Sequence, residues 1–160
     1  QITMITSIWM KPGDDLKTAL DIREQVFQQE LGFTKEADQD ALDAYSYHLV
    51  LLLNDVPVDT GRISYDGVGM ARLSRICVRK KYRRQGIGDG LVKVLDYKAS
   101  QLGMGHSRVE TVPELEPFYM RIGYLATGEA REQYGRKLIT MEKETNDGTR
   151  ENCTHQCPCP

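Results

Sequence analysis

The stretch RKKYRRQGIGDG, residues 79–90, joins two segments whose hydrophobic periodicity differs. The residues before it, GMARLSRICV at 69–78, have the apolar and branched composition that predicts a strand. From Gly86 onward apolar residues recur at helical spacing until Gly103, and HSRVETV at 106–112 predicts another strand. A strand, a helix and a strand in succession are typical of a crossover between parallel neighbours. The quoted stretch is therefore predicted to be the turn that leads into the crossover helix.

This turn has the composition of an anion-binding site. A helix N-terminus presents unpaired N–H groups and a partial positive charge. Gly86 and Gly88 let the backbone approach a ligand without a Cβ in the way. Five cationic side chains add positive potential: Arg79, Lys80, Lys81, Arg83 and Arg84. A ligand with several phosphate groups fits this pattern, and the alternative is a capped turn that simply faces solvent.

The common nucleotide-binding motifs do not match this turn. A P-loop needs Lys followed by Ser or Thr after its last glycine, whereas Asp89 follows Gly88 here. A dinucleotide fingerprint needs a glycine where Leu91 stands. A nucleic-acid interface is the remaining use of a basic run, but no pattern of aromatic residues accompanies it and the net charge of the chain is −2. We therefore expect no nucleic-acid partner.

The pattern Arg83-x-x-Gly86-x-Gly88 resembles the acetyl-CoA signature of the GCN5-related N-acetyltransferase (GNAT) superfamily. The likeness extends to three further segments, which are ALDIREQVFQQELG at 19–32, TGRIS at 60–64 and EPFYMRIGY at 116–124. Altogether it covers residues 2–143. The loop motif alone is moderately specific, whereas the loop, the order of elements and the later Phe-Tyr pair together are strongly so.

The predicted elements follow the order that this family implies. The first is a strand at 2–8 and beyond, followed by a helix that is capped by Asp14 or Asp15 and stops at Gly32. A polar loop at 33–46 with one short helical turn then leads to a hairpin at 47–65, whose turn lies at 54–59. After the strand–helix–strand unit come a short helix at 116–123 and two final strands at 124–130 and 136–143. The expected fold class is a mixed α/β (α+β) GNAT-like fold. It has a mostly antiparallel twisted sheet, with one parallel strand–helix–strand unit splayed to bind acetyl-CoA. The length of 160 residues suits one acetyltransferase domain over 1–145, followed by a polar, disordered tail at 146–160.

The resemblance also implies where acetyl-CoA binds as a cosubstrate. In the family, the main chain of the fourth strand pairs with the pantetheine arm and the amides of the following loop hold the pyrophosphate. The cofactor-binding residues expected on this basis are Ile76, Cys77, Val78, Arg83, Arg84, Gln85, Gly86, Ile87, Gly88, Asp89 and Phe118. The cations are expected to face the phosphates, and the side chain of Asp89 to point away as a helix cap. No metal is expected.

Tyr119 matches the position of the family's general acid. A phenol has a pKa of about 10, so it can give a proton to a departing thiolate. The alternative is an aromatic side chain packed beside Phe118. The base is less defined, because residues 69–78 contain no acid. Glu110 is the first candidate, His48 and Glu30 are other relays, and a chain of water molecules is the alternative.

The expected activity is the transfer of an acetyl group from acetyl-CoA to a primary amine in a ternary complex. The alternative is a non-catalytic module with the same fold that binds CoA as a regulatory signal. The resemblance places acceptor specificity on the first helix, on 33–46 and on 128–135. Asp38, Asp40 and Asp43 favour a cationic acceptor such as a polyamine, an aminoglycoside or a peptide amine, unless they only keep the loop soluble.

No apolar run approaches the roughly 18–20 residues that span a bilayer. The first residues also lack the basic start and apolar middle of a secretory signal. We therefore expect a cytoplasmic protein without a membrane partner. The resemblance to the family further implies that the protein forms a homodimer. The tail sequence CTHQCPCP carries four residues of types that bind metal ions, Cys153, His155, Cys157 and Cys159. Their spacing is too tight for the usual two pairs of zinc ligands, so a disordered tail is expected there.

Overall fold

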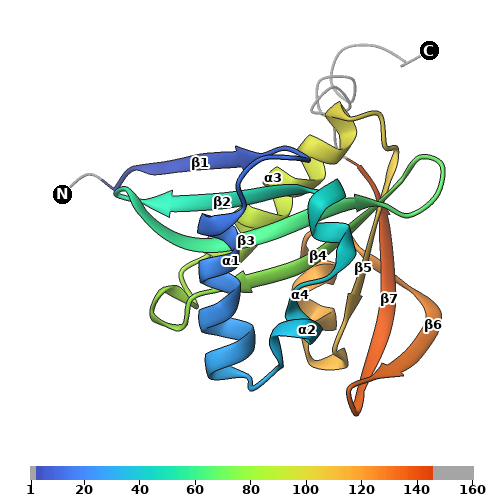
Figure 1. Ribbon diagram of the computed structural model, residues 1–160. Helices are drawn as coiled ribbons and strands as arrows, with labels where there is room; N and C mark the ends of the chain where they lie inside the picture. The colour runs from blue at the N-terminus through green and yellow to red at the C-terminus, as the bar shows by residue number, and fades with distance from the viewer. Residues whose placement is uncertain (1–2, 146–160) are drawn as a thin grey trace. The chain divides into compact units, whose positions relative to one another are not determined.

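The computed structural model describes residues 3–145, and the chain divides into two compact units. The first unit comprises the residues up to 65 together with residues 72–95. The second comprises residues 66–71 and the residues from 96 onward. The boundary therefore falls near the start of strand β4 (Met70–Val78) and inside helix α3 (Ile87–Gln101), both labelled in Figure 1.

The strands of the first unit lie in the order β1-β2-β3-β4. They are β1 (Ile5–Met10), β2 (Tyr47–Leu53), β3 (Val56–Tyr65) and β4. β1 pairs antiparallel with β2, and β2 pairs antiparallel with β3. Asn54 and Asp55 connect the last two with φ of 48° and 67°, as a tight two-residue hairpin requires. The hairpin predicted over 47–65 is confirmed.

The strand β3 begins at Val56, inside the segment that the sequence predicts as a turn. Pro57 argues against a strand because it cannot donate to a ladder of hydrogen bonds. It is tolerated here because the register shifts between Leu51 and Leu52, at a bulge in the pairing of β2 with β3. As a result Asp59, which was expected in an exposed turn, lies within the strand and is completely buried.

Helix α1 (Lys17–Arg23) continues directly into a π-helical segment, Glu24–Glu30, which confirms most of the predicted first helix. Gly32 follows with φ of 79°, the left-handed conformation that ends helices, as predicted. Of the two predicted caps, Asp15 accepts a hydrogen bond from the main-chain N–H of Lys17 at 3.0 Å, although it does not occupy the N-cap position.

Residues 33–46 contain more helix than the sequence predicts. Two short turns are present, α2 (Lys35–Asp38) and a 3₁₀ turn at Ala41–Tyr45. Thr34 caps the first through its side chain, and Asp40 caps the second. Both caps are local signals of the kind that the sequence offers, but such short turns have no hydrophobic periodicity to reveal them.

Helices α1 and α3 cover opposite faces of the strands in the first unit (Figure 1). On the α1 face a buried cluster is formed by Met10, Ala19, Ile22, Val26, Val50 and Cys77. On the other face, Leu95 of α3 lies against Gly61 of β3. A Cβ at Gly61 would come within 2.5 Å of Leu95 Cδ1, so only glycine admits the helix this closely.

The strands of the second unit lie in the order β5-β7-β6, and both pairs are antiparallel. They are β5 (His106–Thr111), β6 (Leu125–Gln133) and β7 (Arg136–Glu144). A 3₁₀ turn at Pro113–Leu115 leads into α4 (Glu116–Arg121). Pro117 lies in the first turn of α4, where a missing N–H costs no helical hydrogen bond. The predicted elements of this region are confirmed.

No helix within residues 3–145 is both long enough and apolar enough to cross a membrane. The same residues hold no cluster of three or more His, Cys, Asp or Glu side chains that could bind a metal ion. Cys77 is a buried free thiol. The tail that carries Cys153, His155, Cys157 and Cys159 lies outside the described residues.

Candidate functional site

The basic turn between β4 and α3 has an unusual backbone. A 3₁₀ turn covers Lys80–Tyr82, and then Arg84 and Gly86 adopt φ of 64° and 76°. Left-handed residues alternating with ordinary ones turn successive N–H groups toward one side, which creates a concave site for an anion. A Cβ placed on Gly86 would meet no heavy atom within 4 Å, so the space beside this residue is open.

Helix α3 begins at Ile87, directly after this turn, as the sequence predicts. The N–H of Gly90 donates to the carbonyl of Gly86 at 3.3 Å, so the amides before Gly90 precede the helical ladder. The positive end of the helix dipole lies at the same place. Asp89 occupies the first turn, where a carboxylate suits that dipole. The predicted pyrophosphate-binding amides thus belong to one continuous segment at a helix N-terminus.

Arg83 is held by two groups of the protein itself. Its Nη1 and Nη2 donate to the two carboxylate oxygens of Glu30, each at 2.6 Å, and its Nε donates to the carbonyl of Val78 at 2.9 Å. The hydrogen bonds between the two side chains raise the pKa of Arg83 and lower the pKa of Glu30. A phosphate would therefore have to share this guanidinium with an existing ion pair.

Arg79 is engaged in a similar way. Its Nε donates to the side-chain oxygen of Gln25 at 2.9 Å, and its Nη1 donates to the carbonyl of Pro57 at 2.8 Å. The guanidinium also lies over the ring of Tyr82, 5.4 Å from the ring centre. Two of the five cations of the turn therefore bind to neighbouring segments of the first unit.

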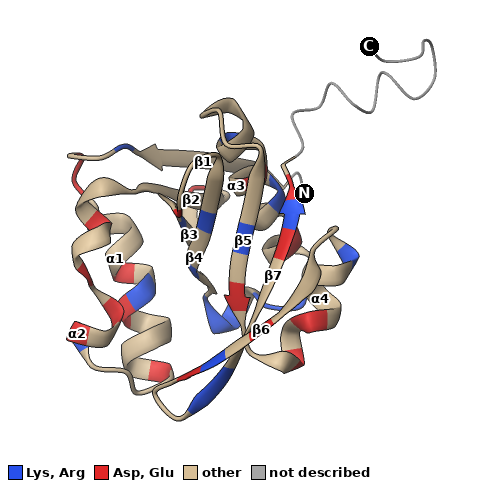
Figure 2. Cartoon of the chain, turned by 90° about the vertical axis from the view of Figure 1, so that its right-hand side faces the viewer, with Lys and Arg blue, Asp and Glu red and all other residues tan. Residues whose placement is uncertain are grey.

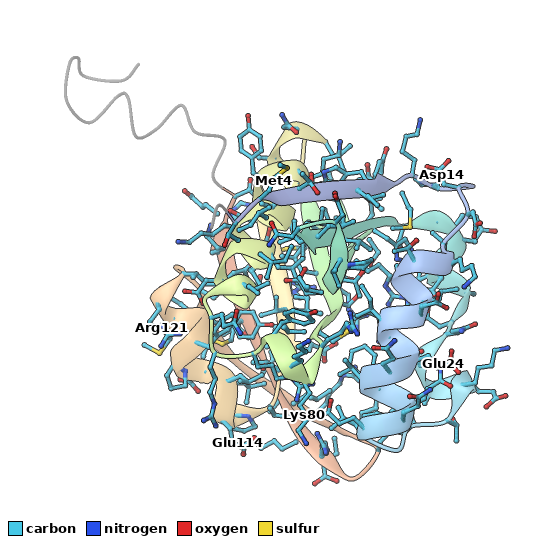
Figure 3. All side chains as sticks on the ribbon, turned by 90° about the vertical axis from the view of Figure 1, so that its left-hand side faces the viewer. Met4, Asp14, Glu24, Lys80, Glu114 and Arg121 are labelled. Carbon is cyan, nitrogen blue, oxygen red and sulfur yellow. The ribbon has the colours of Figure 1, made fainter. Side chains whose placement is uncertain are left out.

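Lys80 and Lys81, together with Arg79, line a cavity of about 340 Å³ beside the π-helical segment. Figure 3 shows Lys80 near the end of the helix that carries Glu24. Arg84 is exposed and makes no hydrogen bond or ion pair with another described residue. Of the cations, Lys80, Lys81 and Arg84 are placed to face a ligand in solution.

A second, apolar cavity of about 180 Å³ lies against the other side of the turn. Gln85, Gly86 and Ile87 line it together with Leu51 and Val58 of the hairpin. The turn therefore borders an apolar hollow of the first unit.

Ile76, Cys77 and Val78 lie at the end of β4, in the same unit as the turn. These are the residues that were expected to meet the pantetheine arm. Arg75, just before them, has φ of 52°, so the strand is irregular at that point. Cys77 packs into the α1 cluster, and burial raises the pKa of its thiol far above the ordinary value. Cys77 is therefore an inert core residue, and only its main chain is suited to bind a ligand.

The acidic residues of 33–46 do not form the negatively charged rim that the sequence suggested. Asp38, Asp40 and Asp43 are each bound by arginine side chains within the first unit. Arg62 Nη1 lies 2.7 Å from Asp40 Oδ1 and 2.9 Å from Asp43 Oδ1. Arg75 adds a 3.1 Å contact to Asp40. The expectation of electrostatic attraction to a cationic acceptor is therefore corrected.

Four of the six members of this cluster are deeply buried, whereas Arg75 and Asp40 are partly exposed. Arg23, Arg62, Asp38 and Asp43 are all less than one-tenth exposed. Burial opposes ionisation of Asp43, but hydrogen bonds from Arg23 and Arg62 prevail and lower its pKa to about 2. Figure 2 shows acidic and basic residues side by side on α1 and α2. Three carboxylates and three guanidiniums neutralise one another here, so the cluster has a structural role.

His48, a candidate relay, belongs to this buried region. Its side chain is completely buried, and Nε2 lies 3.0 Å from the main-chain oxygen of Asp43. Burial lowers the pKa of His48, so the imidazole is neutral. Its ring is enclosed by the protein and cannot reach an acceptor amine, so the relay expectation is corrected for this residue.

In the second unit, Tyr119 is buried within α4 and only 6% exposed. Its ring packs edge-on against Phe118, with 4.9 Å between centres, and against Tyr124, with 5.6 Å. Burial raises the pKa of Tyr119 to about 12. The packed aromatic cluster that the sequence offered as an alternative is present, and the phenol remains protonated at neutral pH.

Glu110 on β5 is paired with Arg131 on β6. Arg131 donates through Nε to one carboxylate oxygen and through Nη2 to the other at 3.0 Å. The hydrogen bonds with Glu110 raise the pKa of Arg131. Glu110 is thus a carboxylate held in one orientation by two hydrogen bonds from the same guanidinium.

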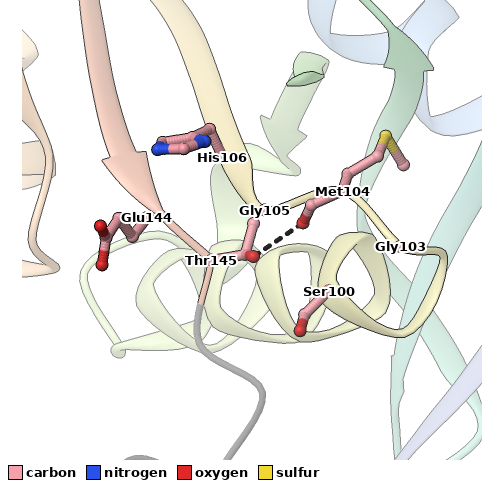
Figure 4. A pocket seen from close by; sticks show the side chains of 7 residues that line it. All are labelled: Ser100, Gly103, Met104, Gly105, His106, Glu144 and Thr145. Atoms are coloured by element: carbon pink, nitrogen blue, oxygen red, sulfur yellow. Dashed lines mark hydrogen bonds between the residues drawn. The ribbon is translucent and has the colours of Figure 1, made fainter. Parts of the chain in front are cut away.

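A further hollow in the second unit is polar and open. Its volume is about 370 Å³, and it lies where α3 ends and β5 begins (Figure 4). His106 and Glu144 face each other across β5 and β7, and Thr145 Oγ1 donates to the carbonyl of Met104 at 2.7 Å. None of the predicted site residues lines this hollow.

The chain is similar to known proteins over residues of both units. The family model described as "Acetyltransferase (GNAT) domain" matches residues 18–145. An uncharacterized N-acetyltransferase of Bacillus subtilis (strain 168), YjcF, is 34% identical over 120 residues, which are 74% of this chain and 84% of that protein.

Solved structures agree. A crystal structure of a candidate N-acetyltransferase from Lactobacillus plantarum has a TM-score of 0.82 at 26% identity, and the match covers 89% of this chain and 99% of that chain. The ribosomal-protein-S18-alanine N-acetyltransferase from Escherichia coli has a TM-score of 0.69 at 18% identity over 89% of this chain and 94% of that chain, a likeness in fold alone. The predicted mixed α/β fold class is confirmed.

Proposed function

Because this chain belongs to the GNAT acetyltransferase family, we propose that it transfers the acetyl group of acetyl-CoA to a primary amine. The observation that carries the proposal is the turn before α3. Left-handed Arg84 and Gly86 shape a concave run of amides there, at the positive end of a 15-residue helix and among cationic side chains. A turn of this kind suits the phosphate groups of a diphosphate.

We propose that the donor is held by two successive parts of the first unit. Main-chain groups of Ile76, Cys77 and Val78 would pair with the pantetheine arm, and the amides of 84–89 would bind the diphosphate. The open space beside Gly86 supports this assignment. Phe118 is proposed as a further contact with the thioester end.

The proposed chemistry is direct transfer. The amine nitrogen forms a bond to the thioester carbonyl carbon, the C–S bond breaks, and the thiolate leaves with the electron pair. Tyr119 gives its phenolic proton to that sulfur and is protonated again from solvent. Burial keeps Tyr119 protonated, with a pKa of about 12, so its proton is still present when the sulfur leaves.

Glu110 is proposed to accept the proton that the amine loses. Its ion pair with Arg131 fixes the carboxylate in direction. Because an alkyl ammonium with a pKa of about 10.4 is mostly protonated at neutral pH, the amine is deprotonated with the help of water. The acceptor is assigned no further than a primary amine, because the acidic cluster that suggested a cationic substrate is neutralised internally.

The second candidate function is a non-catalytic module that binds CoA as a signal. Two observations favour it. Glu110 is already bound to Arg131, and β4 contains no Asp or Glu that could serve as a base.

One experiment separates the two functions. Free thiol released from acetyl-CoA is measured with the purified chain and a panel of primary amines that includes amino acids, polyamines, aminoglycosides and short peptides. Thiol release that depends on one amine supports the enzyme. Acetyl-CoA binding in calorimetry without release for any amine supports the module, and the absence of both binding and release contradicts both.

A further inference from the structure

We infer that Glu30 and Arg83 form a latch that positions the turn before α3, so that Arg83 acts through the shape of the turn and not as a ligand of phosphate. The inference rests on the proposed function, since it names residues that prepare the acetyl-CoA site. Glu30 lies at the end of the π-helical segment that continues α1, and Arg83 lies three residues before Gly86.

The geometry of Arg83 joins three segments of the chain. Two parallel bonds of 2.6 Å to Glu30 anchor the guanidinium to the π-helical segment, which lies 53 residues away in sequence. The third bond, from Nε to the carbonyl of Val78, ties the same guanidinium to the last residue of β4. A guanidinium has five N–H donors, and three of them are used in this way. Arg83 thus fixes the turn to both the π-helical segment and β4, directly before the residues that are proposed to bind phosphate.

The backbone after Arg83 explains why such an anchor is needed. Arg84 has φ of 64°, a left-handed conformation that is unfavourable for a residue with a side chain. Strained residues of this kind persist only when the surrounding structure holds them in place. The hydrogen bonds of Arg83 hold the backbone in place next to Arg84. The hydrogen bonds of Arg79 to Gln25 and Pro57 do the same at the start of the turn.

The end of the π-helical segment is itself fixed. The N–H of Leu31 donates to the carbonyl of Val26 at 3.0 Å, and the N–H of Phe33 donates to the carbonyl of Phe27 at 2.9 Å. Glu30 therefore projects from a defined backbone. Segments of π-helix are frequent at functional sites, and here the segment carries the acidic half of the latch.

The direction in which Glu30→Gln changes the affinity for acetyl-CoA distinguishes the latch from a purely electrostatic effect of Glu30. Glu30→Gln removes a negative charge beside a site for an anion, so electrostatics alone predicts tighter binding of acetyl-CoA. The latch predicts weaker binding, by about fivefold or more, because an amide cannot hold the guanidinium by two charge-assisted bonds. Glu24→Gln, at the start of the same π-helical segment, is the matched control and should leave the affinity unchanged or slightly improve it.

The experiment is a calorimetric titration of acetyl-CoA into the full chain, into Glu30→Gln, Arg83→Lys and their double variant, and into the control. Thermal unfolding without ligand checks that each variant is folded. The latch predicts that both single variants weaken binding to a similar degree and that the double variant is no weaker than either. If Glu30→Gln proves unstable, Arg83→Lys alone should still weaken binding, since an ammonium cannot form the paired contact.

Two results overturn the inference while the proposed function stands. Unchanged or tighter binding in Glu30→Gln shows that the pair does not shape the turn. If the loss in Arg83→Lys is added in full to that of Glu30→Gln in the double variant, Arg83 contacts the phosphates itself. If the unmodified chain fails to bind acetyl-CoA, the proposed function is contradicted, and the latch falls with it.

Discussion

Arg23 on α1 and Asp38 on α2 form an ion pair with 2.9 Å between Nε and Oδ1, and their side chains are 1% and 0% exposed. The same guanidinium reaches Asp43 at 2.7 Å. One buried cation therefore ties the first helix to both short turns of 33–46. Removing one partner of such a pair leaves an uncompensated charge in the interior, which is strongly destabilising.

Asp38→Ala should accordingly lower the free energy of unfolding by about 3–5 kcal/mol, measured by urea denaturation at pH 7. The control is Asp21→Ala, which breaks the exposed pair of Lys17 with Asp21 and should leave the denaturation midpoint unchanged. Equal effects of the two substitutions would show that burial does not decide the strength of these pairs.

Asp59 should make the stability of the protein fall as the pH rises. Burial raises the pKa of its carboxyl group to about 7, and neither carboxylate oxygen has a hydrogen-bond partner among the described residues. Between pH 4 and pH 7 the unfolded chain has lost this proton while the folded chain keeps it, so the free energy of unfolding decreases with pH in this window. Each unit of pKa corresponds to about 1.4 kcal/mol.

Asp59→Asn should remove that slope. From pH 4.5 to pH 7.5 the stability of the unmodified chain should fall, relative to the variant, by an amount on the order of 3 kcal/mol. Urea denaturation at several pH values measures the difference. Asp55→Asn, in the exposed hairpin turn, is the control and should keep the original profile. Parallel profiles for the unmodified chain and Asp59→Asn would mean that Asp59 is ionised when folded.

Tyr119→Phe should slow turnover by about 10²–10⁴-fold, the usual contribution of a general acid, and leave the affinity for acetyl-CoA unchanged. The ring still packs against Phe118 and Tyr124, so the fold should be retained. Turnover is measured as thiol release with the most active amine, and affinity by calorimetry. Tyr134→Phe, at an exposed position, is the control. Undiminished turnover in Tyr119→Phe would remove this residue as the acid.

Glu110→Gln should reduce thiol release and make the remaining activity rise with pH, because the amine must then lose its proton unaided. The acetyl-CoA affinity should stay the same. Arg131→Gln tests the pairing itself, since it frees Glu110 while keeping the carboxylate. If Glu110→Gln keeps full activity at pH 7, the proton leaves through water alone.

The turn before α3 could be predicted from the sequence because its signals are local. The hydrophobic periodicity changes from that of a strand to that of a helix within a few residues, and Gly86 and Gly88 lie at this change. These residues determine the local backbone conformation. The hairpin was predictable for the same reason. Pro57 misled the prediction of where β3 begins, since nothing local reveals the bulge that accommodates it.

The partners of the charged residues could not be predicted. Glu30 and Arg83 are 53 residues apart, and Asp40 and Arg75 are 35 apart. Such pairs depend on which helix faces which strand end, and residue type alone does not encode that. The acidic loop therefore looked like a solvent-facing surface in the sequence, although its carboxylates are bound by arginines in the fold.

In the proposed function, amides around Gly86 receive the diphosphate of acetyl-CoA. Calorimetric titration of acetyl-CoA into the unmodified chain and Gly86→Glu tests it, with Gly13→Glu as a control for a left-handed glycine with open space elsewhere in the first unit. We predict measurable binding to the unmodified chain and to Gly13→Glu, and a loss of affinity of about 100-fold or more in Gly86→Glu. Equal affinity of Gly86→Glu and the unmodified chain would contradict the account.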